Sequence, residues 1–354
     1  MIIQFNKQVS RILDYLMFPK MYFMVKDYKQ LNDDVFKTVI SQEYLDYAKK
    51  METTLIQSKQ MIEELFEDNI YSVYDYINLL IKAYPPYEDV DEHQYLQRLA
   101  SIEAEPFKLA MIEALLNIEE DNQIDKSVDE KNAMAYIHEL NIAPANKWNL
   151  LLMIQDPKTQ LKKLTDLLKE YEDIFYKYYK EKEAMVLEVG HRLEETLSHK
   201  TVDSLNQLTF QSINYDFKEG ESCYIYVSSL FPYTMRILED NDLRIVWGLE
   251  MESAFKKVHE INENKLLNRV KVFKALGDKT RYETLKLLAE GVDSVKKIAA
   301  TLNVSSATIS YHINEFLTAG IVHIHRGKET QSTYQVDYDC LNEVIRGFKD
   351  DLSF

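Results

Sequence analysis

The side chains best suited to chemistry lie in one short stretch, SSATISYHINEFLTAG, at positions 305–320. It is rich in short hydroxyl and amide groups, and its one acid is Glu315. A helix that approaches base edges in the major groove needs hydrogen-bonding side chains that the phosphates do not repel. The composition of the stretch therefore favours contact with DNA.

The periodicity of this stretch indicates which side is free. Ile309, Ile313, Phe316 and Leu317 recur at helical spacing and are predicted to be buried. The opposite side then presents small polar groups to bases, while lysines on the preceding helix and basic residues on a following hairpin reach phosphates. The predicted DNA-contacting residues are Ser294, Lys296, Lys297, Ser305, Ser306, Ala307, Thr308, Ser310, Tyr311, His312, Asn314, Arg326 and Lys328.

The flanking sequence predicts the elements that position these residues. Asp278, Ser294 and Ser305 are each placed to cap a helix, and Gly291 and Gly320 are placed to end one. Asn303 suits the left-handed conformation of a tight turn, so two short helices joined by a tight turn are expected. The segments IVHIHRG and STYQV then predict a β-hairpin. Together these elements predict a winged helix-turn-helix.

The segments LGDKTRYETLKLL, SVKKIAATLNVSSATISYHINEFLTAGIV and HRGKETQSTYQV follow one another within 266–345. Together they resemble the ArsR-type winged helix-turn-helix repressors. The resemblance implies DNA binding, usually repression, and a homodimer formed by the first and last helices, here LLNRVKVFKAL and DYDCLNEVIRGF. Metal-sensing members carry Cys-Val-Cys where this chain has Ser294-Val295-Lys296, and no histidine follows His325 to complete their second site. We therefore expect no metal at the family's sites and no cofactor.

The upstream sequence predicts a large helical region. No glycine occurs before Gly190, which favours long helices. One helix is expected from Pro157 to about His199, with an apolar seam that suits either a dimeric coiled coil or, as we favour, packing within its own domain. Short β-branched and aromatic runs between about 207 and 250 predict a small antiparallel meander. The fold class is thus mainly α, with domains at 1–205 (acidic helices), 206–260 (meander and connecting helix) and 261–354 (winged helix).

Charge divides the chain in the same way. Its net charge is −16, yet 266–345 holds ten Lys and Arg against nine Asp and Glu. Residues 1–265 hold 30 Lys and Arg against 47 Asp and Glu, a charge that repels polyanions unless it faces away from them. No run of about 18 apolar residues and no signal-peptide pattern occurs, so we expect a cytoplasmic protein without a membrane span.

Other candidate sites have weaker support. His323 and His325 could share one metal, although solvated histidines are the preferred interpretation, and Arg281 suits either a phosphate contact or an internal salt bridge. No phosphate loop or catalytic motif is present, so an enzyme is not expected. Our hypothesis is a sequence-specific regulator, a repressor in the family's usual manner, whose residues 1–260 sense a small-molecule or protein effector or mediate oligomerisation. The alternative is a winged-helix scaffold for protein interactions.

Overall fold

The computed structural model describes residues 2–26, 39–66, 73–118, 127–199, 204–215, 222–239, 242–292, 294–326 and 333–354. The chain is mainly α, as predicted. The helices upstream of the central sheet are α1 (Lys7–Met17), η1 (Phe18–Phe23), α4 (Gln42–Leu55), η2 (Ile56–Ser58), α5 (Lys59–Leu65), α6 (Tyr76–Ala83), α7 (Glu92–Ser101), α8 (Ala104–Leu116), α9 (Glu130–Glu139), α10 (Pro144–Gln155), α11 (Pro157–Glu170), α12 (Glu172–His199) and α13 (Ser204–Leu208).

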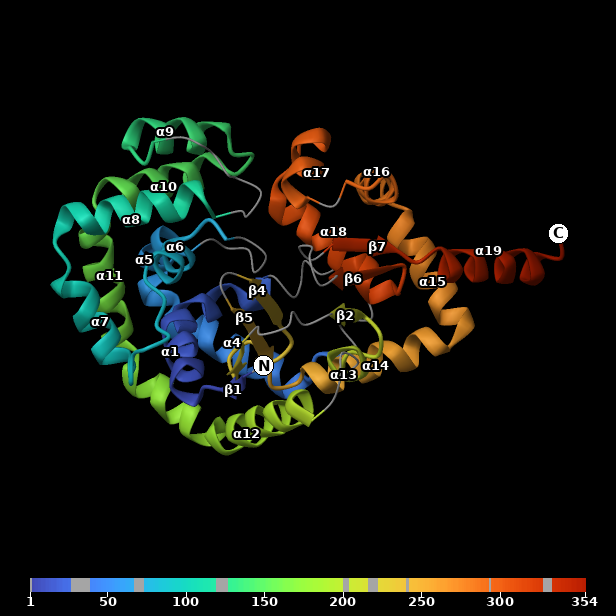
Figure 1. The fold of residues 1–354 in the computed structure, drawn as a ribbon, viewed down its shortest axis with the longest axis horizontal. Helices are drawn as coiled ribbons and strands as arrows, with labels where there is room; N and C mark the ends of the chain where they lie inside the picture. Colours follow the sequence, from blue (N-terminus) through green and yellow to red (C-terminus); the bar gives the residue numbers. More distant parts are fainter. Residues whose placement is uncertain are drawn as a thin grey trace.

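Several of these helices begin where a local side chain accepts a hydrogen bond from one of their first amide groups. Asp75, Asp91 and Asp129 accept hydrogen bonds from the backbone N–H three residues on, at 2.9, 2.7 and 2.9 Å. Their apolar faces form one large buried cluster, the helical core, to which Leu230, Tyr233 and Ala254 also belong. In Figure 1 the helices α7 to α11 form the outer rim on the left, and α12 runs along the lower edge.

The long helix expected from Pro157 to about His199 is two helices. It is interrupted at Tyr171, where φ is −109° and ψ is 8°. The Tyr171 hydroxyl lies 2.8 Å from Ser58 Oγ, so a contact with η2 holds the break. The apolar seam is buried in the helical core from Leu161 to Tyr178, whereas Met185 is exposed. The seam therefore packs within its own domain and does not form a coiled coil.

The predicted antiparallel meander is wrong. Strands β1 (Ile3–Phe5), β3 (Cys223–Ser228), β5 (Leu243–Gly248) and β4 (Met235–Glu239) form a sheet in that order, and only β4 and β5 pair antiparallel. The physical reason is burial, because β5 is almost wholly buried and takes an inner position between β3 and β4. The outer edge beside β3 is filled by β1, which comes from the start of the chain.

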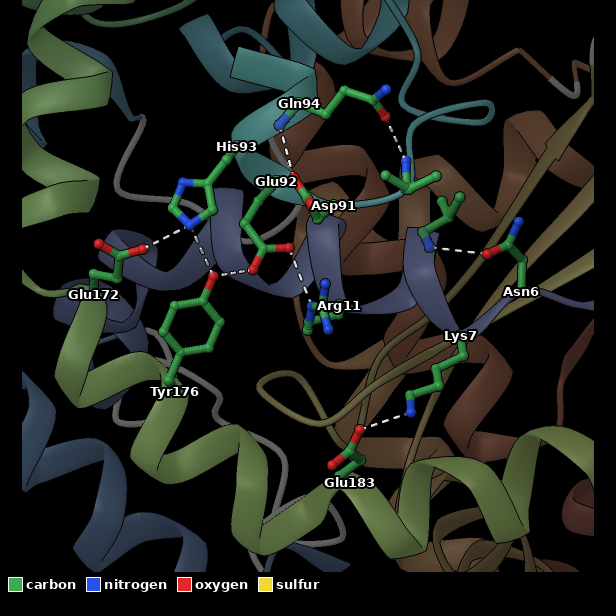
Figure 2. A network of polar contacts seen from close by, with 12 residues as sticks. Asn6, Lys7, Arg11, Asp91, Glu92, His93, Gln94, Glu172, Tyr176 and Glu183 are labelled. Carbon is green, nitrogen blue, oxygen red and sulfur yellow. Dashed lines mark hydrogen bonds and ion pairs between the residues drawn. The ribbon is translucent and has the colours of Figure 1, made fainter. Parts of the chain in front are cut away.

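Helix α1, which follows the N-terminal strand, is held by α7 and α12. Figure 2 shows a polar network in which buried Glu92 of α7 accepts a hydrogen bond from Arg11 Nε at 3.1 Å and another from the Tyr176 hydroxyl. Nearby, His93 Nε2 lies 3.0 Å from Glu172 Oε1. The network joins α1, α7 and α12, and so fixes the segment that leads from β1.

Two helices connect the sheet to the C-terminal part, α14 (Met251–Glu263) and α15 (Lys265–Leu276). They meet at Asn264, whose backbone is extended (ψ 96°) and whose side chain caps α15. The expectation of a helical rather than a loose connection near 260 is confirmed. The winged helix continues with α16 (Lys279–Ala289), α17 (Val295–Leu302), α18 (Ser306–Ala319), β6 (Val322–Arg326), β7 (Thr333–Val336) and α19 (Tyr338–Leu352).

The winged helix has its own buried cluster, which contains only residues between Val272 and Val344. Its hairpin is nevertheless extended by a strand from upstream, β2 (Ile213–Tyr215), which pairs parallel to β6. Figure 1 shows the winged helix in orange and red on the right, with α19 projecting away from the rest. The domain boundaries proposed from the sequence stay a prediction.

Candidate nucleic-acid interface

The turn between α17 and α18 has the predicted geometry. Asn303 adopts the left-handed conformation, with φ 55° and ψ 46°. The following N–H, that of Val304, donates to the Ala299 carbonyl at 3.0 Å. Ala299 is buried where the two helices approach each other. A small residue and a left-handed turn therefore set the angle of a helix-turn-helix.

The second of these helices, α18, begins and ends as predicted. Ser305 Oγ accepts a hydrogen bond from the Thr308 N–H at 3.1 Å. Gly320 ends the helix with φ 70°, a conformation that favours glycine. Ile309, Ile313 and Phe316 are buried in the core of the winged helix. The inward face was thus predicted from the sequence, and the outward face follows from it.

The predicted phosphate-contacting residues differ in their accessibility. Lys297 is exposed, whereas Ser294 is buried and uses its hydroxyl to cap α17, accepting from the Lys297 N–H at 3.3 Å. The Lys296 ammonium lies over the Tyr136 ring of α9, 5.1 Å from its centroid. Arg326 ends β6, and Lys328 lies outside the described residues.

The base-contacting candidates on α18 are all at least partly covered. Each residue from Val304 to Gly320 is buried or half-buried. Ser306, Ala307, Ser310 and Asn314 lie on the half-buried side, and Tyr311 packs against the helical core of the upstream region. The middle of the outward face of α18, at Tyr311, is therefore in contact with the upstream region.

His312 does not border the outward face, contrary to our expectation. It is 7% exposed, and neither ring nitrogen has a hydrogen-bond partner among the described residues. Burial lowers the pKa of His312 to about 4, against an opposing effect of Asp278. The spacing of Ile309, His312 and Phe316 explains the difference, because positions three and four apart share one face.

Two further candidates have internal partners. Arg281 Nε donates to the Ala275 carbonyl at 2.9 Å and Nη1 lies 3.8 Å from Glu315, which confirms the internal salt bridge over the phosphate contact. His323 Nε2 lies 2.8 Å from Asp337 Oδ2, so this histidine is paired rather than solvated. Among the described residues, no group of three or more His, Cys, Asp and Glu is placed to hold a metal ion.

Two of the contacts that join the winged helix to the upstream region could not be predicted from the sequence. Tyr136 lies far before Lys296 in the sequence, and β2 lies far before β6. Neither contact has a local sequence signal. Tyrosine on an amphipathic helix and a short apolar run are each too common to indicate a partner.

Comparisons with known proteins agree with this geometry. The model of the bacterial regulatory protein, arsR family, matches residues 278–323. Over 76 residues the chain is 43% identical to an uncharacterized HTH-type transcriptional regulator of Methanocaldococcus jannaschii, a match that covers 21% of this chain and 84% of that protein. No solved structure matches the chain. Both matches support a DNA-binding transcriptional regulator, and through this C-terminal part the chain belongs to the arsR family of bacterial regulatory proteins.

Proposed function

We propose that the protein is a sequence-specific repressor that binds DNA as a dimer and that residues 1–260 regulate this binding. The observation that carries the proposal is the outward face of α18, which presents short hydroxyl and amide groups next to the exposed Lys297. Glu315, the acid of this helix, is buried and lies 3.8 Å from Arg281. Such a face can enter a major groove without repulsion from phosphate.

Selection of bound genomic fragments, followed by binding titrations on the selected duplex and on a scrambled duplex, tests this function. Tyr311→Ala should reduce the ratio of the two affinities, because base contacts specify sequence. Lys297→Ala should weaken both duplexes alike and reduce the salt slope by about 0.9, because it removes one phosphate contact. Equal binding of the two duplexes by the unaltered protein would contradict sequence-specific recognition.

A dimer is supported by an apolar strip on α15 and α19. The two helices pack together, with the Phe273 and Phe348 rings 5.0 Å apart and Arg269 paired with Asp351 at 2.7 Å. Their outer sides nevertheless leave large apolar side chains in solvent, and such contiguous patches mark interfaces. We call this strip the dimer face; it comprises Leu266, Leu267, Val270, Phe273, Ile345, Phe348 and Leu352.

A sensing role for the upstream region is supported by a cavity of about 510 Å³ between α4 and α12. Aromatic side chains line it, and Tyr47 and Tyr178 stack with ring centroids 4.4 Å apart. The cavity also reaches Leu249 and Glu250, which directly precede α14. A molecule bound there would touch the start of the helix that leads to the winged helix, which is why we propose this cavity as the effector site.

The contact between α18 and the upstream helices favours one alternative, a winged helix that binds protein instead of DNA. The two functions predict different partners for the same face. Under the alternative, the selection of genomic fragments would recover no common sequence. Lys297→Ala would then leave the salt dependence of any residual binding to duplex DNA unchanged.

A further inference from the structure

The DNA-contacting face of α18 is in contact with the upstream helical region. Tyr311, at the middle of the outward face, packs against the helical core, whose buried members all lie at or before residue 254. On the preceding helix, Lys296 of α17 lies over the Tyr136 ring of α9. Figure 1 shows α17 close to α9 on the upper side of the molecule.

Helix α18 as a whole is less exposed than the helix before it. By contrast with α18, where every residue is at least half-buried, α17 and the turn after it leave Lys297, Ala300, Thr301 and Asn303 exposed. A recognition helix must place its outward side chains within hydrogen-bond distance of base edges. Tyr311 cannot contact the helical core and a major groove at once.

We propose that this structure is a closed, autoinhibited form, in which the acidic upstream region covers the recognition helix and must separate from it before DNA binds. The inference rests on the proposed DNA-binding function. Residues 1–265 hold 47 acidic side chains against 30 basic ones, so their presence at the DNA-binding face adds repulsion of phosphate to the steric block.

Several short contacts between described residues join the two parts. The core of the winged helix is separate, and α14 and α15 are joined at the extended Asn264. Next to this joint, Asn262 Nδ2 lies 3.5 Å from the Thr318 carbonyl, and the pairing of β2 with β6 is short. Among the described residues, separation requires the release of Tyr311, Lys296, the Asn262–Thr318 contact and this short strand, with movement about Asn264.

The proposal can be tested through Tyr136, which belongs to α9 and not to the proposed DNA-contacting set. Its side chain is 4% exposed, and its hydroxyl lies 3.3 Å from that of Tyr74. Tyr136→Leu removes both the hydroxyl and the aromatic face under Lys296, whereas Tyr136→Phe removes the hydroxyl alone. A cation–π contact is worth up to about a fivefold change in an equilibrium constant at a partly covered site.

In the full-length chain, Tyr136→Leu should therefore bind a selected duplex and a scrambled duplex about three- to fivefold more tightly than Tyr136→Phe, because the closed form is less populated. Equal gains on the two duplexes are expected, since closure penalises every duplex alike. Equal affinities of the two variants, with matching circular dichroism spectra, would overturn the proposal.

Hydrogen exchange gives a second, independent measurement on the unaltered protein. Addition of the selected duplex should slow exchange in residues 306–319 and speed it in residues 130–139, which touch no DNA but lose their cover. Slower or unchanged exchange in 130–139 would overturn the proposal. A further outcome separates the two proposals. If neither duplex binds, but residues 306–319 exchange faster in Tyr136→Leu than in Tyr136→Phe, the closed form is supported and the proposed DNA-binding function is contradicted.

Discussion

His312 is a buried histidine on the inner side of the recognition helix α18, and its burial makes the stability of the folded protein depend on pH. Its pKa is about 4 in the folded protein and about 6.5 in an unfolded chain. The unfolded state therefore binds more protons between these values. Stability contributed by the neutral ring is present above pH 6.5 and is lost as the pH falls toward 4.

We expect the free energy of unfolding to fall by up to about 1.4 kcal/mol for each pH unit within this window. His312→Leu keeps an apolar group at the site and should remove that part of the pH dependence. Urea titrations at pH 7 and pH 5 measure the difference between the two proteins. A loss on acidification as large in the variant as in the unaltered protein would show that His312 is not its cause.

At the scale of helices and strands, α15 and α19 expose large apolar side chains that a partner could bury. Their outward apolar side chains stay in solvent, with Val270 and Leu352 each 59% exposed. Burying such side chains contributes about 1.5 to 3 kcal/mol each. A second copy of the same face would provide that burial and would also set two recognition helices at a fixed separation.

Val270→Glu should therefore convert a dimer into a monomer at micromolar concentration, as sedimentation velocity would show. Affinity for a duplex with two half-sites should drop by about a hundredfold, because the second half-site no longer binds as part of one unit. Tyr282→Glu is the matched control, because Tyr282 is similarly exposed but lies on α16, outside the dimer face. If both variants sediment alike, the dimer face is assigned wrongly.

Elements that depend on neighbouring residues, such as capped helices, could be predicted from the sequence. Elements that depend on pairing with residues far away in the chain could not. Asp278, Ser294 and Ser305 cap helices through the N–H three residues on, so a few letters of sequence suffice. Strand β1 pairs with β3 although most of the upstream region separates them in the sequence, and no local pattern specifies that choice. The inward face of α18 followed from its own periodicity, while its cover depends on distant residues such as Tyr136.

At the scale of the whole molecule, the cavity between α4 and α12 and the recognition helix lie at opposite ends of α14. Glu250 lines the cavity and its N–H donates to the Pro232 carbonyl at 2.8 Å, while Asn262 near the other end of α14 contacts Thr318 of α18. A rigid helix between two sites can transmit a small displacement.

Among the described residues, no helix is both long and apolar enough to cross a membrane.

Native mass spectrometry of the full-length chain should reveal a noncovalently bound molecule of a drug-like size, the size that such cavities hold. Lys177→Trp should exclude it, because Lys177 is an exposed residue of the cavity lining. Lys180→Trp, exposed on the same helix but away from the lining, should retain it. Equal retention by both variants would place the bound molecule elsewhere, and its absence from all three proteins would leave the cavity without an occupant.

The pairing of β2 with β6 attaches the wing through backbone groups. The Ile324 N–H donates to the Ser212 carbonyl at 3.2 Å, and such a bond forms with almost any side chain at either position. Substitutions on α18 that alter the preferred DNA sequence therefore leave this attachment intact. Operator choice and the link between the two parts of the chain can diverge independently over evolutionary time.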